Sequence, residues 1–268
     1  MSDILAMLVL GVVEGITEFL PISSTGHLIL AADAMGVGAG SAVIEIVIQL
    51  GAVLAVLWFY RGDLTARVSA LRSAERDAGF WWRLAVAAVP AAVFGFALSD
   101  IITTYLFDPL VVAAAMIVGG VVLWFVDRYV PERDAARATT ALDAMTLRQA
   151  LLIGTVQVLA LIPGTSRSAS SIVGGLLVGL DRPTATAFSF YLAIPTLGGA
   201  TLYALVKNAG ALLADGSLAL LALGVATAFG TSLVAMRWLL RYVANHDFRY
   251  FALYRVVVGV VLVVVLRA

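Results

Sequence analysis

Long apolar runs occupy most of this chain and leave little room for a soluble fold. Six of them, at roughly 17–23 residues each, are long enough to cross a bilayer as helices. They lie at about 41–60, 84–107, 109–126, 184–206, 217–236 and 250–266. Because the runs are continuous and do not alternate over about ten residues, they exclude a transmembrane β-barrel. The pattern predicts an all-α polytopic membrane protein.

The composition agrees with this class and excludes several functions. Of the 268 residues, 62% are hydrophobic and 13% are charged, whereas soluble domains carry about 25% charged residues. The formal net charge is zero, so no basic surface indicates a nucleic-acid partner. The chain has no cysteine, which rules out disulfides and thiolate metal sites.

Two further apolar segments, at about 4–36 and 148–180, are too long for one span and are interrupted midway. The first is broken at Pro21-Ile-Ser-Ser-Thr-Gly26 and the second at Pro163-Gly-Thr-Ser-Arg167. Each half would form a helix of about 13–16 residues, roughly 20–24 Å long, which is shorter than the hydrocarbon core of about 30 Å. We therefore expect two re-entrant hairpins whose tips are buried in protein or line a wet cavity.

The arginines test this topology, because positive charge collects on the cytoplasmic side of membrane proteins. They form three groups between the expected spans, and the groups share one side only if both broken segments are hairpins. The groups are Arg61, Arg67, Arg72, Arg76 and Arg83; Arg128, Arg133, Arg137, Arg148 and Arg182; and Arg237, Arg241 and Arg249. The other side then retains only Lys207 and Arg267.

Each half of the chain then holds one hairpin and three transmembrane helices. Because three crossings leave the chain on the other side of the membrane, the second half starts from the opposite side and the two halves are oppositely oriented. The segment from Leu10 to Ser24 has a weak likeness to that from Ile153 to Ser166. We expect a single membrane domain at 1–268, with one repeat at about 1–126, a cytoplasmic linker at about 127–147 and a second repeat at about 148–268. Inverted-topology repeats with broken helices are common in secondary transporters, so topology alone favours a transporter.

The first polar run places two carboxylates, Glu14 and Glu18, on one face of a helix about 6 Å apart. Two facing carboxylates are unfavourable unless a cation or a shared proton lies between them. Their hard oxygen ligands suit a divalent cation, Mg²⁺ or Ca²⁺. The alternative is that arginines elsewhere in the fold pair with the two glutamates.

Three hydroxyl residues, Ser23, Ser24 and Thr25, follow Pro21 where the next helix is expected to begin. One hydroxyl is enough to cap a helix start. The same start also favours phosphate, because its free N–H groups and the helix dipole attract an anion. His27 lies within reach of these hydroxyls, and imidazole transfers protons near neutral pH.

The second polar run repeats this arrangement around Arg167, with Thr165, Ser166 and Ser168 beside it. An arginine in the bilayer must be paired, and its planar fork matches two phosphate oxygens. Its alternative partner is one of the two glutamates of the first hairpin. Hairpins that enter from opposite faces would bring both tips to one anion. Carboxylates, a histidine and serines exceed what carrying phosphate requires, and they favour cleaving it.

Weaker candidates lie outside the two polar runs. Glu45 and Gln49 lie in the first expected span, where Glu45 could hold the metal, support it or form an interhelical pair. Arg255 follows Tyr254 early in the last span, and we expect it to extend towards the cytoplasmic interface as a structural residue.

At these residues the chain resembles the undecaprenyl-diphosphate phosphatases of the bacitracin-resistance type. The likeness is carried by the run from Glu14 to His27 (Glu-Gly-Ile-Thr-Glu-Phe-Leu-Pro-Ile-Ser-Ser-Thr-Gly-His) and by Pro163-Gly-Thr-Ser-Arg-Ser168. Further similarity at 45–51 and 188–195 extends it over nearly the whole chain. Ala169 departs from the glycine that the family usually has after Arg-Ser, which could tighten the tip and lower activity.

The resemblance implies a multi-pass enzyme of the bacterial inner membrane that removes the terminal phosphate of a C55 polyprenyl diphosphate. This reaction recycles the lipid carrier for peptidoglycan synthesis and gives bacitracin resistance. The resemblance also implies a divalent cation, held here by Glu14 and Glu18, and a site that opens to the periplasm. The implied catalytic residues are Glu14, Glu18, Ser24, His27 and Arg167. The residues expected to bind phosphate are Ser23, Thr25, Gly164, Thr165, Ser166 and Ser168.

Two mechanisms stay open for such a site. Ser24 could attack the terminal phosphorus and form a phosphoserine, with His27 or Glu18 accepting its proton. Alternatively, activated water attacks directly and Ser24 only positions the phosphate. The expected partners are the polyprenyl diphosphate and membrane lipids, without nucleic acid, and a homo-oligomer is left open. The rival class is an inverted-repeat transporter or flippase of a phosphorylated polyprenyl lipid or another anion.

Overall fold

The computed structural model describes residues 3–36, 42–71, 78–130, 138–210 and 218–266, and their regular structure is helical apart from one bridge between Thr139 and Leu180. The long helices are α3 (Ala42–Phe59), α5 (Gly79–Ala97), α7 (Pro109–Tyr129), α10 (Arg182–Lys207), α12 (Leu218–Val243) and α13 (Arg249–Val265). The hairpin helices are α1 (Asp3–Thr17) and α2 (Ser24–Ala34), then α8 (Leu147–Gln157), the 3₁₀ turn η3 (Val158–Leu161) and α9 (Arg167–Leu177). The short elements are α4 (Arg61–Ala70), α6 (Ser99–Ile101), the π turn η1 (Ile102–Leu106) and η2 (Leu142–Ala144).

The long helices fit a multi-pass membrane protein. In the described part of the chain, α5, α7, α10 and α12 are long and apolar enough to cross a bilayer. A fifth span is added if α3 and α4, which meet at a bend of 63°, are counted together. The 17 residues of α13 extend about 26 Å, which is short for a core of about 30 Å. The class is confirmed, and the count of six spans stays a prediction.

The span expected at 84–107 is wrong at both ends. The helix α5 begins earlier, because Phe80 is buried with its ring 5.0 Å from that of Tyr191. It ends at Ala97, and the polar residues Ser99 and Asp100 then open the short α6. The residues that follow, Ile102–Leu106, belong to the turn η1. Continuous hydropathy cannot show where a chain reverses direction inside an apolar run.

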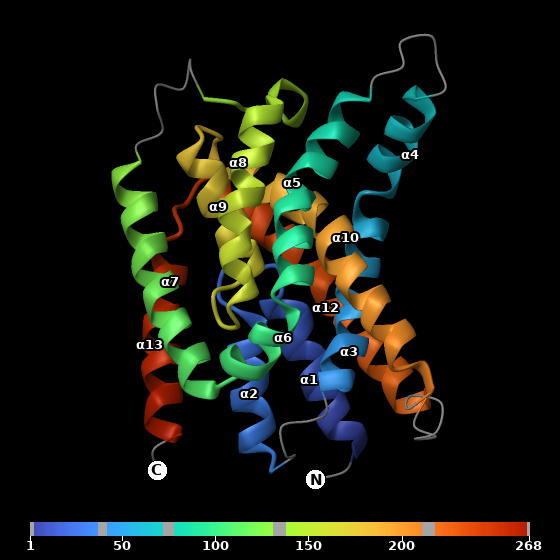
Figure 1. Cartoon of the computed structure of the whole chain (residues 1–268), viewed down its shortest axis with the longest axis vertical. Helices are drawn as coiled ribbons and strands as arrows, with labels where there is room; N and C mark the ends of the chain where they lie inside the picture. The colour runs from blue at the N-terminus through green and yellow to red at the C-terminus, as the bar shows by residue number, and fades with distance from the viewer. Residues whose placement is uncertain (1–2, 37–41, 72–77, 131–137, 211–217, 267–268) are drawn as a thin grey trace.

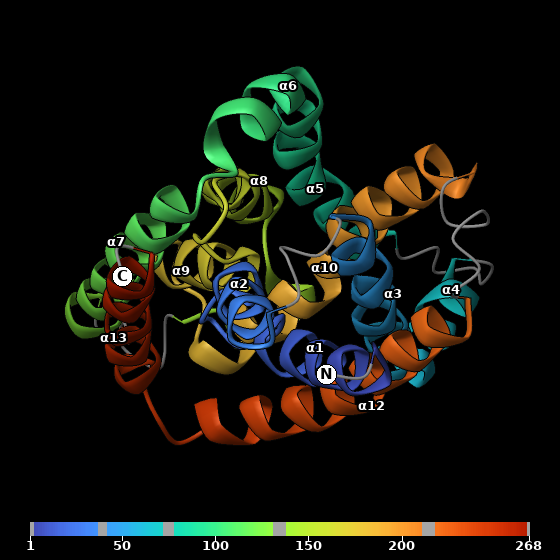
Figure 2. The same ribbon diagram turned by 90° about the horizontal axis from the view of Figure 1, so that it is seen from below.

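The two broken segments form hairpins that approach from opposite ends of the molecule. In Figure 1, α1 and α2 occupy the lower end, whereas α8 and α9 descend from the upper end. Seen from below, α2 and α9 lie near the centre, with α3, α5, α7, α10, α12 and α13 around them (Figure 2). This places both irregular tips inside the protein, as expected for backbone that cannot face lipid.

Glycines let each hairpin pack closely against a long helix. A Cβ on Gly11 would lie 2.8 Å from the carbonyl oxygen of Gly224 in α12. A Cβ on Gly154 would lie 2.1 Å from the carbonyl oxygen of Ala87 in α5. Sequence comparison aligns Gly11 with Gly154, so the two hairpins use the same position for close approach. The division into inverted repeats, with its boundaries, stays a prediction.

Arginine–aspartate pairs gather the expected cytoplasmic segments at one end of the molecule. The carboxylate of Asp127, at the end of α7, accepts hydrogen bonds from Arg182 at 2.8 Å and from the amide of Phe248 at 3.0 Å. Asp143 accepts a hydrogen bond of 2.7 Å from Arg67. This bond, together with the charge of Arg67, lowers the pKa of Asp143. Asp127 thus holds the end of α7 to the starts of α10 and α13, and Asp143 holds α4 to the turn η2.

Candidate functional site

Each hairpin tip ends in a serine with an unusual backbone. Ser23 has φ 74° and Ser166 has φ 73°, and no other described residue except glycine has a positive φ. Such conformations cost about 1–3 kcal/mol and are concentrated at functional sites. Each serine directly precedes a helix, so Ser23 corresponds structurally to Ser166. The likeness between the two broken segments paired Ser24 with Ser166, which is one residue out of register with the structure. The reason is that three residues separate Pro163 from the start of α9, whereas two separate Pro21 from the start of α2.

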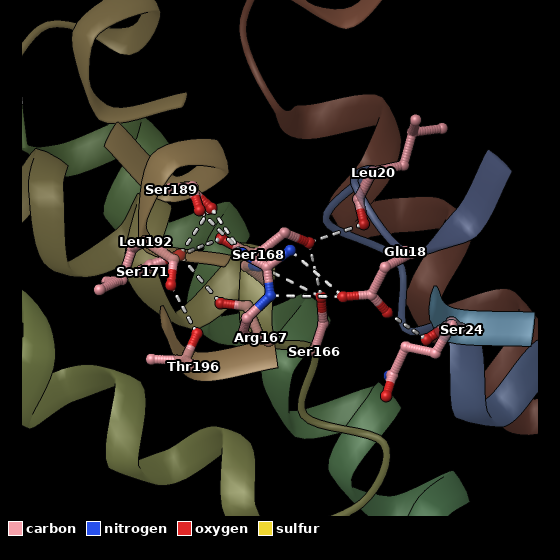
Figure 3. A network of polar contacts seen from close by, with 12 residues as sticks. Glu18, Leu20, Ser24, Ser166, Arg167, Ser168, Ser171, Ser189, Leu192 and Thr196 are labelled. Atoms are coloured by element: carbon pink, nitrogen blue, oxygen red, sulfur yellow. Dashed lines mark hydrogen bonds and ion pairs between the residues drawn. The ribbon is translucent and has the colours of Figure 1, made fainter. Parts of the chain in front are cut away.

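One carboxylate joins the two hairpins. Ser24 donates a hydrogen bond of 2.8 Å from Oγ to Oε2 of Glu18. The guanidinium of Arg167 contacts the other oxygen of Glu18, with 3.3 Å from Nε and 3.2 Å from Nη2 to Oε1. These contacts are drawn in Figure 3. The predicted convergence of the tips is present, and Ser24 and Arg167 each occupy the first position of their helix.

The Glu18–Arg167 pair is shielded from solvent. The side chain of Glu18 is 6% exposed and that of Arg167 is 12% exposed. Arg167 also donates a hydrogen bond of 2.8 Å to the carbonyl of Ser189 in α10. The hydroxyl of Ser171 fixes Ser189 from the other side, with 2.7 Å between the two Oγ atoms. The guanidinium is thus held from α10 on one side, and its ion pair with Glu18 offsets its charge. The expected alternative, an ion pair between the two hairpins, is what the structure contains.

Both ring nitrogens of His27 bond to groups other than Ser24 and Glu18. Its Nδ1 lies 2.7 Å from the carbonyl oxygen of Ser23, and its Nε2 lies 2.8 Å from the hydroxyl of Tyr254. A carbonyl only accepts, so Nδ1 is the protonated nitrogen and Nε2 accepts from Tyr254 when the ring is neutral. Tyr254 in α13 also stacks on the imidazole, with 5.5 Å between ring centroids. Sequence reasoning missed Tyr254 as a partner of the site.

Glu14 lies one turn before Glu18 and is 1% exposed. Among the described side chains, no group of three or more aspartate, glutamate, histidine or cysteine residues could hold a metal ion. A pair of carboxylates still fits Mg²⁺, which commonly takes one or two of them and fills its shell with water and substrate phosphate. Glu45 lies outside the side chains that the structure describes. Gln49 accepts a hydrogen bond of 3.1 Å from Thr201 in α10.

The remaining candidates of the second tip serve mainly its internal structure. The hydroxyl of Ser166 caps α9 by accepting from the amide of Ala169 at 3.2 Å. Ser168 is buried and donates a hydrogen bond of 2.9 Å to the carbonyl of Leu20 in the first tip. Gly164 has φ 92°, and a Cβ there would lie 2.3 Å from the carbonyl oxygen of Val112. Their binding of phosphate stays a prediction.

In the first tip, Ser23 and Thr25 lie on either side of Ser24. Ser23 is buried, and its side chain makes no capping hydrogen bond to α2. Thr25 is half-buried in the first turn of that helix. The start of α2 therefore differs from that of α9, which Ser166 caps.

The direction predicted for the side chain of Arg255 is wrong. This side chain does not reach the interface but is fully buried beneath both tips. It donates to the carbonyls of Thr165 at 2.8 Å, Gly164 at 3.1 Å and Pro21 at 3.3 Å. Two further carbonyls, those of Ala115 and Met116 in α7, lie 3.4 Å from its nitrogens. Arg255 therefore links α7, α13 and both hairpin tips.

Room for this arginine comes from two glycines in α7. A Cβ on Gly119 would lie 2.2 Å from Nη2 of Arg255, and one on Gly120 would lie 2.7 Å from the carbonyl oxygen of Ala252. The Gly119-Gly120 pair inside an apolar helix was the sequence signal that a large group packs there. Small residues in membrane helices mark such close approaches.

An apolar cavity of about 410 Å³ lies between α7, η3 and α9. Its walls include Val118, Val122 and Leu159, whereas Thr165 and Arg255 contribute polar atoms. The cavity thus extends from apolar side chains of α7 to the second hairpin tip.

Comparison with known proteins places the chain in a family. The model of the family described as bacitracin resistance protein BacA matches residues 7–261. A protein of Herminiimonas arsenicoxydans named undecaprenyl-diphosphatase is 47% identical over 262 residues, which is 97% of this chain and 94% of that protein. Proteins of the same name are 47% identical over 263 residues in Deinococcus deserti, covering 97% and 94% of the two chains, and 45% identical over 256 residues in Ectopseudomonas mendocina, covering 95% and 91%. The chain therefore belongs to the bacitracin resistance protein BacA family.

Proposed function

We propose that this chain is a membrane phosphatase that hydrolyses undecaprenyl diphosphate to undecaprenyl phosphate and inorganic phosphate. Its family and the names of its relatives support this substrate. The observation that carries the proposal is that Glu18 contacts both Ser24 on one hairpin and Arg167 on the other. These three groups supply a nucleophile, a proton acceptor and an anion-binding cation, which phosphoryl transfer requires.

Ser24 is the proposed nucleophile, and Glu18 is its proton acceptor. The hydroxyl already donates to Oε2 of Glu18 at 2.8 Å, so its proton passes to the carboxylate as Oγ attacks the terminal phosphorus. The bond between this phosphorus and the bridging oxygen breaks, and undecaprenyl phosphate leaves. Water then attacks the phosphoserine, phosphate is released, and the proton on Glu18 returns to Ser24. Of the two expected bases, Glu18 is preferred because both ring nitrogens of His27 have other partners.

Arg167 is proposed to bind the terminal phosphate and to stabilise the charge that develops on its oxygens. Its guanidinium can form two parallel hydrogen bonds to phosphate. The start of α2 lies beside Ser24, and the N–H groups there favour an anion. Because phosphate and Glu18 compete for the same guanidinium, substrate binding would release Oε1 of Glu18. His27, bonded to Tyr254 and to the carbonyl of Ser23, is a positioning residue for this tip.

The proposed divalent cation would be held by Glu14 and Glu18 together with phosphate oxygens of the substrate. When bound, such a cation neutralises charge on the diphosphate and aids departure of the leaving group. Mg²⁺ and Ca²⁺ are the proposed cations, because both prefer hard oxygen ligands such as these carboxylates.

The apolar cavity between α7 and α9 is proposed to receive the isoprenoid tail next to the diphosphate. Its valine and leucine walls match a branched hydrocarbon. Arg255 and Thr165 mark the end nearest the charged head of the lipid. The rest of a C55 chain would extend into the surrounding bilayer.

We further propose that the enzyme lies in the bacterial inner membrane and that its site opens to the periplasm. The arginines at one end support a cytoplasmic assignment for that end. The first hairpin, which carries Ser24, enters from the opposite end (Figure 1). Recycling of the carrier lipid for peptidoglycan synthesis and bacitracin resistance would follow from this activity, and a homo-oligomer is compatible with it.

A transporter or flippase of a phosphorylated lipid is the alternative, because opposed hairpins also occur in secondary transporters. Phosphate release by the purified protein from undecaprenyl diphosphate separates the two functions. We expect turnover in the wild type and at least a 100-fold loss in Glu18→Gln and Arg167→Ala, with Arg148→Ala as an arginine control far from the tips. Lipid flux in liposomes without phosphate release would refute the phosphatase.

A second experiment tests the covalent step. Substrate labelled with ³²P on the terminal phosphate is mixed with enzyme and quenched in acid within milliseconds to seconds. The phosphoserine mechanism predicts labelled protein, loss of label in Ser24→Ala, and full labelling in Ser69→Ala, a serine on the exposed face of α4. Turnover by Ser24→Ala within tenfold of the wild type would instead assign the attack to water.

A further inference from the structure

A cavity of about 440 Å³ lies away from the hairpin tips, between the bend from α3 to α4 and the last turns of α12. Its lining includes three arginines, Arg61, Arg237 and Arg241. Its other walls are apolar and include Trp58, Leu233 and Leu240. It lies at the same end of the molecule as α4 in Figure 1, where the membrane-spanning part of α3 ends.

The three arginines have no acidic partner among the residues that the structure describes, whereas nearby arginines do. Arg67 pairs with Asp63 and Asp143, and Arg249 pairs with Asp247. Arg61 instead contacts Trp58, by a hydrogen bond of 2.8 Å to its carbonyl and by a guanidinium 4.4 Å from its ring centroid.

This arrangement concentrates positive charge at one point. Arg237 and Arg241 are four residues apart on α12, so their charges face each other on the helix surface. Like charges at this spacing repel and destabilise the helix unless an anion lies between them. Arg61 adds a third guanidinium from the facing helix. The cavity is therefore complementary to an anion that can bridge α4 and α12.

The apolar walls identify the kind of anion. Trp58 is 53% exposed beside the cavity, and tryptophan is typical of the headgroup level of a bilayer. Leu233 lies one turn before Arg237 on α12, towards the hydrocarbon region, and Leu240 lies between the two arginines of that helix. Inorganic phosphate or a nucleotide would leave these side chains without a partner. A phospholipid places phosphate among the arginines and an acyl chain against the leucines.

We propose that this cavity is a binding site for the headgroup of an anionic phospholipid from the surrounding membrane. The site is separate from the phosphatase chemistry and does not depend on it. Basic pockets between membrane helices on the cytoplasmic side recognise such headgroups. A lipid bound here would connect α4 to α12, and α12 packs on α1, the helix that leads to Glu18. It would thereby support the first hairpin.

Native mass spectrometry of the purified full chain in neutral detergent tests the proposal, with phosphatidylglycerol as the probe. Phosphatidylcholine controls for lipid without net charge, and inorganic phosphate controls for a free anion. The test variant is R237Q/R241Q, and the charge-matched control is R128Q/R148Q, which removes two exposed arginines from the same end of the molecule. Arg61→Gln is a second test from the opposite wall.

We expect phosphatidylglycerol to bind the wild type and R128Q/R148Q equally and to raise their melting temperatures. R237Q/R241Q should bind about 30-fold more weakly, because each arginine near an anionic headgroup contributes about fivefold in affinity. Arg61→Gln should bind about fivefold more weakly. Equal binding by R237Q/R241Q and wild type would overturn the site. An equal loss in R128Q/R148Q, or an equal shift with inorganic phosphate, would overturn the assignment to a lipid headgroup.

Discussion

The burial of Arg255 beneath both hairpin tips leads to the sharpest prediction, and Gly119 gives a way to test it without altering the arginine. In Gly119→Ala the added methyl would lie 2.2 Å from Nη2 of Arg255. This nitrogen donates to the carbonyls of Thr165 and Gly164 at 2.8 and 3.1 Å. Since the helix backbone cannot yield easily, the guanidinium must move and these two bonds must lengthen or break.

The expected loss can be worked from these contacts. A hydrogen bond to a charged group contributes about 1.5–3 kcal/mol of stabilising free energy, so the two bonds stabilise the position of the second tip by about 3–6 kcal/mol. Water and side-chain relaxation will recover part of this, and we expect about 3 kcal/mol to be lost from positioning of the tip. Because about 1.4 kcal/mol is tenfold in rate, kcat should fall about 100-fold. The kcat of the direct variant Arg255→Lys should fall at least as far, because an ammonium has three donors and lacks the planar, forked donor geometry of a guanidinium.

The assay is phosphate release from undecaprenyl diphosphate, with melting temperature measured on the same samples. Gly230→Ala is the matched control, because a Cβ at that helical position meets open space, and it should retain wild-type kcat. A kcat for Gly119→Ala within threefold of wild type would refute the positioning role. A fall in kcat accompanied by unfolding at the assay temperature would assign Arg255 to stability alone.

Three further outcomes are expected. Gly15→Ala should lower the free energy of unfolding by about 3 kcal/mol or prevent folding, because its methyl would lie 2.0 Å from Oγ1 of Thr231; denaturation monitored by circular dichroism measures this. Arg67 lowers the pKa of Asp143, so their pair stabilises the fold above the ordinary carboxyl pKa and ceases to do so as pH falls through the lowered value. Asp143→Asn should therefore lower the free energy of unfolding by about 0.5 kcal/mol at pH 7, because the pair is exposed, and should leave it unchanged near pH 2. Melting curves at both pH values would measure this. Val118→Trp, which narrows the apolar cavity, should raise the KM for undecaprenyl diphosphate several-fold and the KM for farnesyl diphosphate by a similar factor, because both lipids place their first isoprene units there; steady-state phosphate release measures both constants.

The sequence predicted the architecture well because the bilayer allows few solutions. Continuous apolar runs indicated helices, and the prolines with polar residues after them indicated hairpins. The cost of burying charge indicated that Arg167 needs a partner, and a glutamate of the first hairpin was the alternative to phosphate. What average hydropathy did not locate was the turn after Ala97, because the polar residues Ser99 and Asp100 are too few to interrupt the apolar run around them.

The sequence indicated which residues gather at the two hairpin tips, but it did not indicate all of their contacts. Arg255 lies only two turns from the start of α13, so its long side chain had two directions open to it. The space beside Gly119 decided between them, and that space exists only in the folded chain. Likewise, nothing local to His27 indicates that its ring faces Tyr254, which is 227 residues away in the chain.

The contact between Glu18 and Arg167 joins residues that lie 149 positions apart. Cutting the backbone between α7 and α8 would therefore separate the proposed nucleophile, Ser24, from Arg167, the proposed phosphate-binding cation. Fragments ending before 131 and starting at 138 should each be inert when expressed alone. Co-expressed, they should recover activity in proportion to their association, since no covalent link between them takes part in the chemistry.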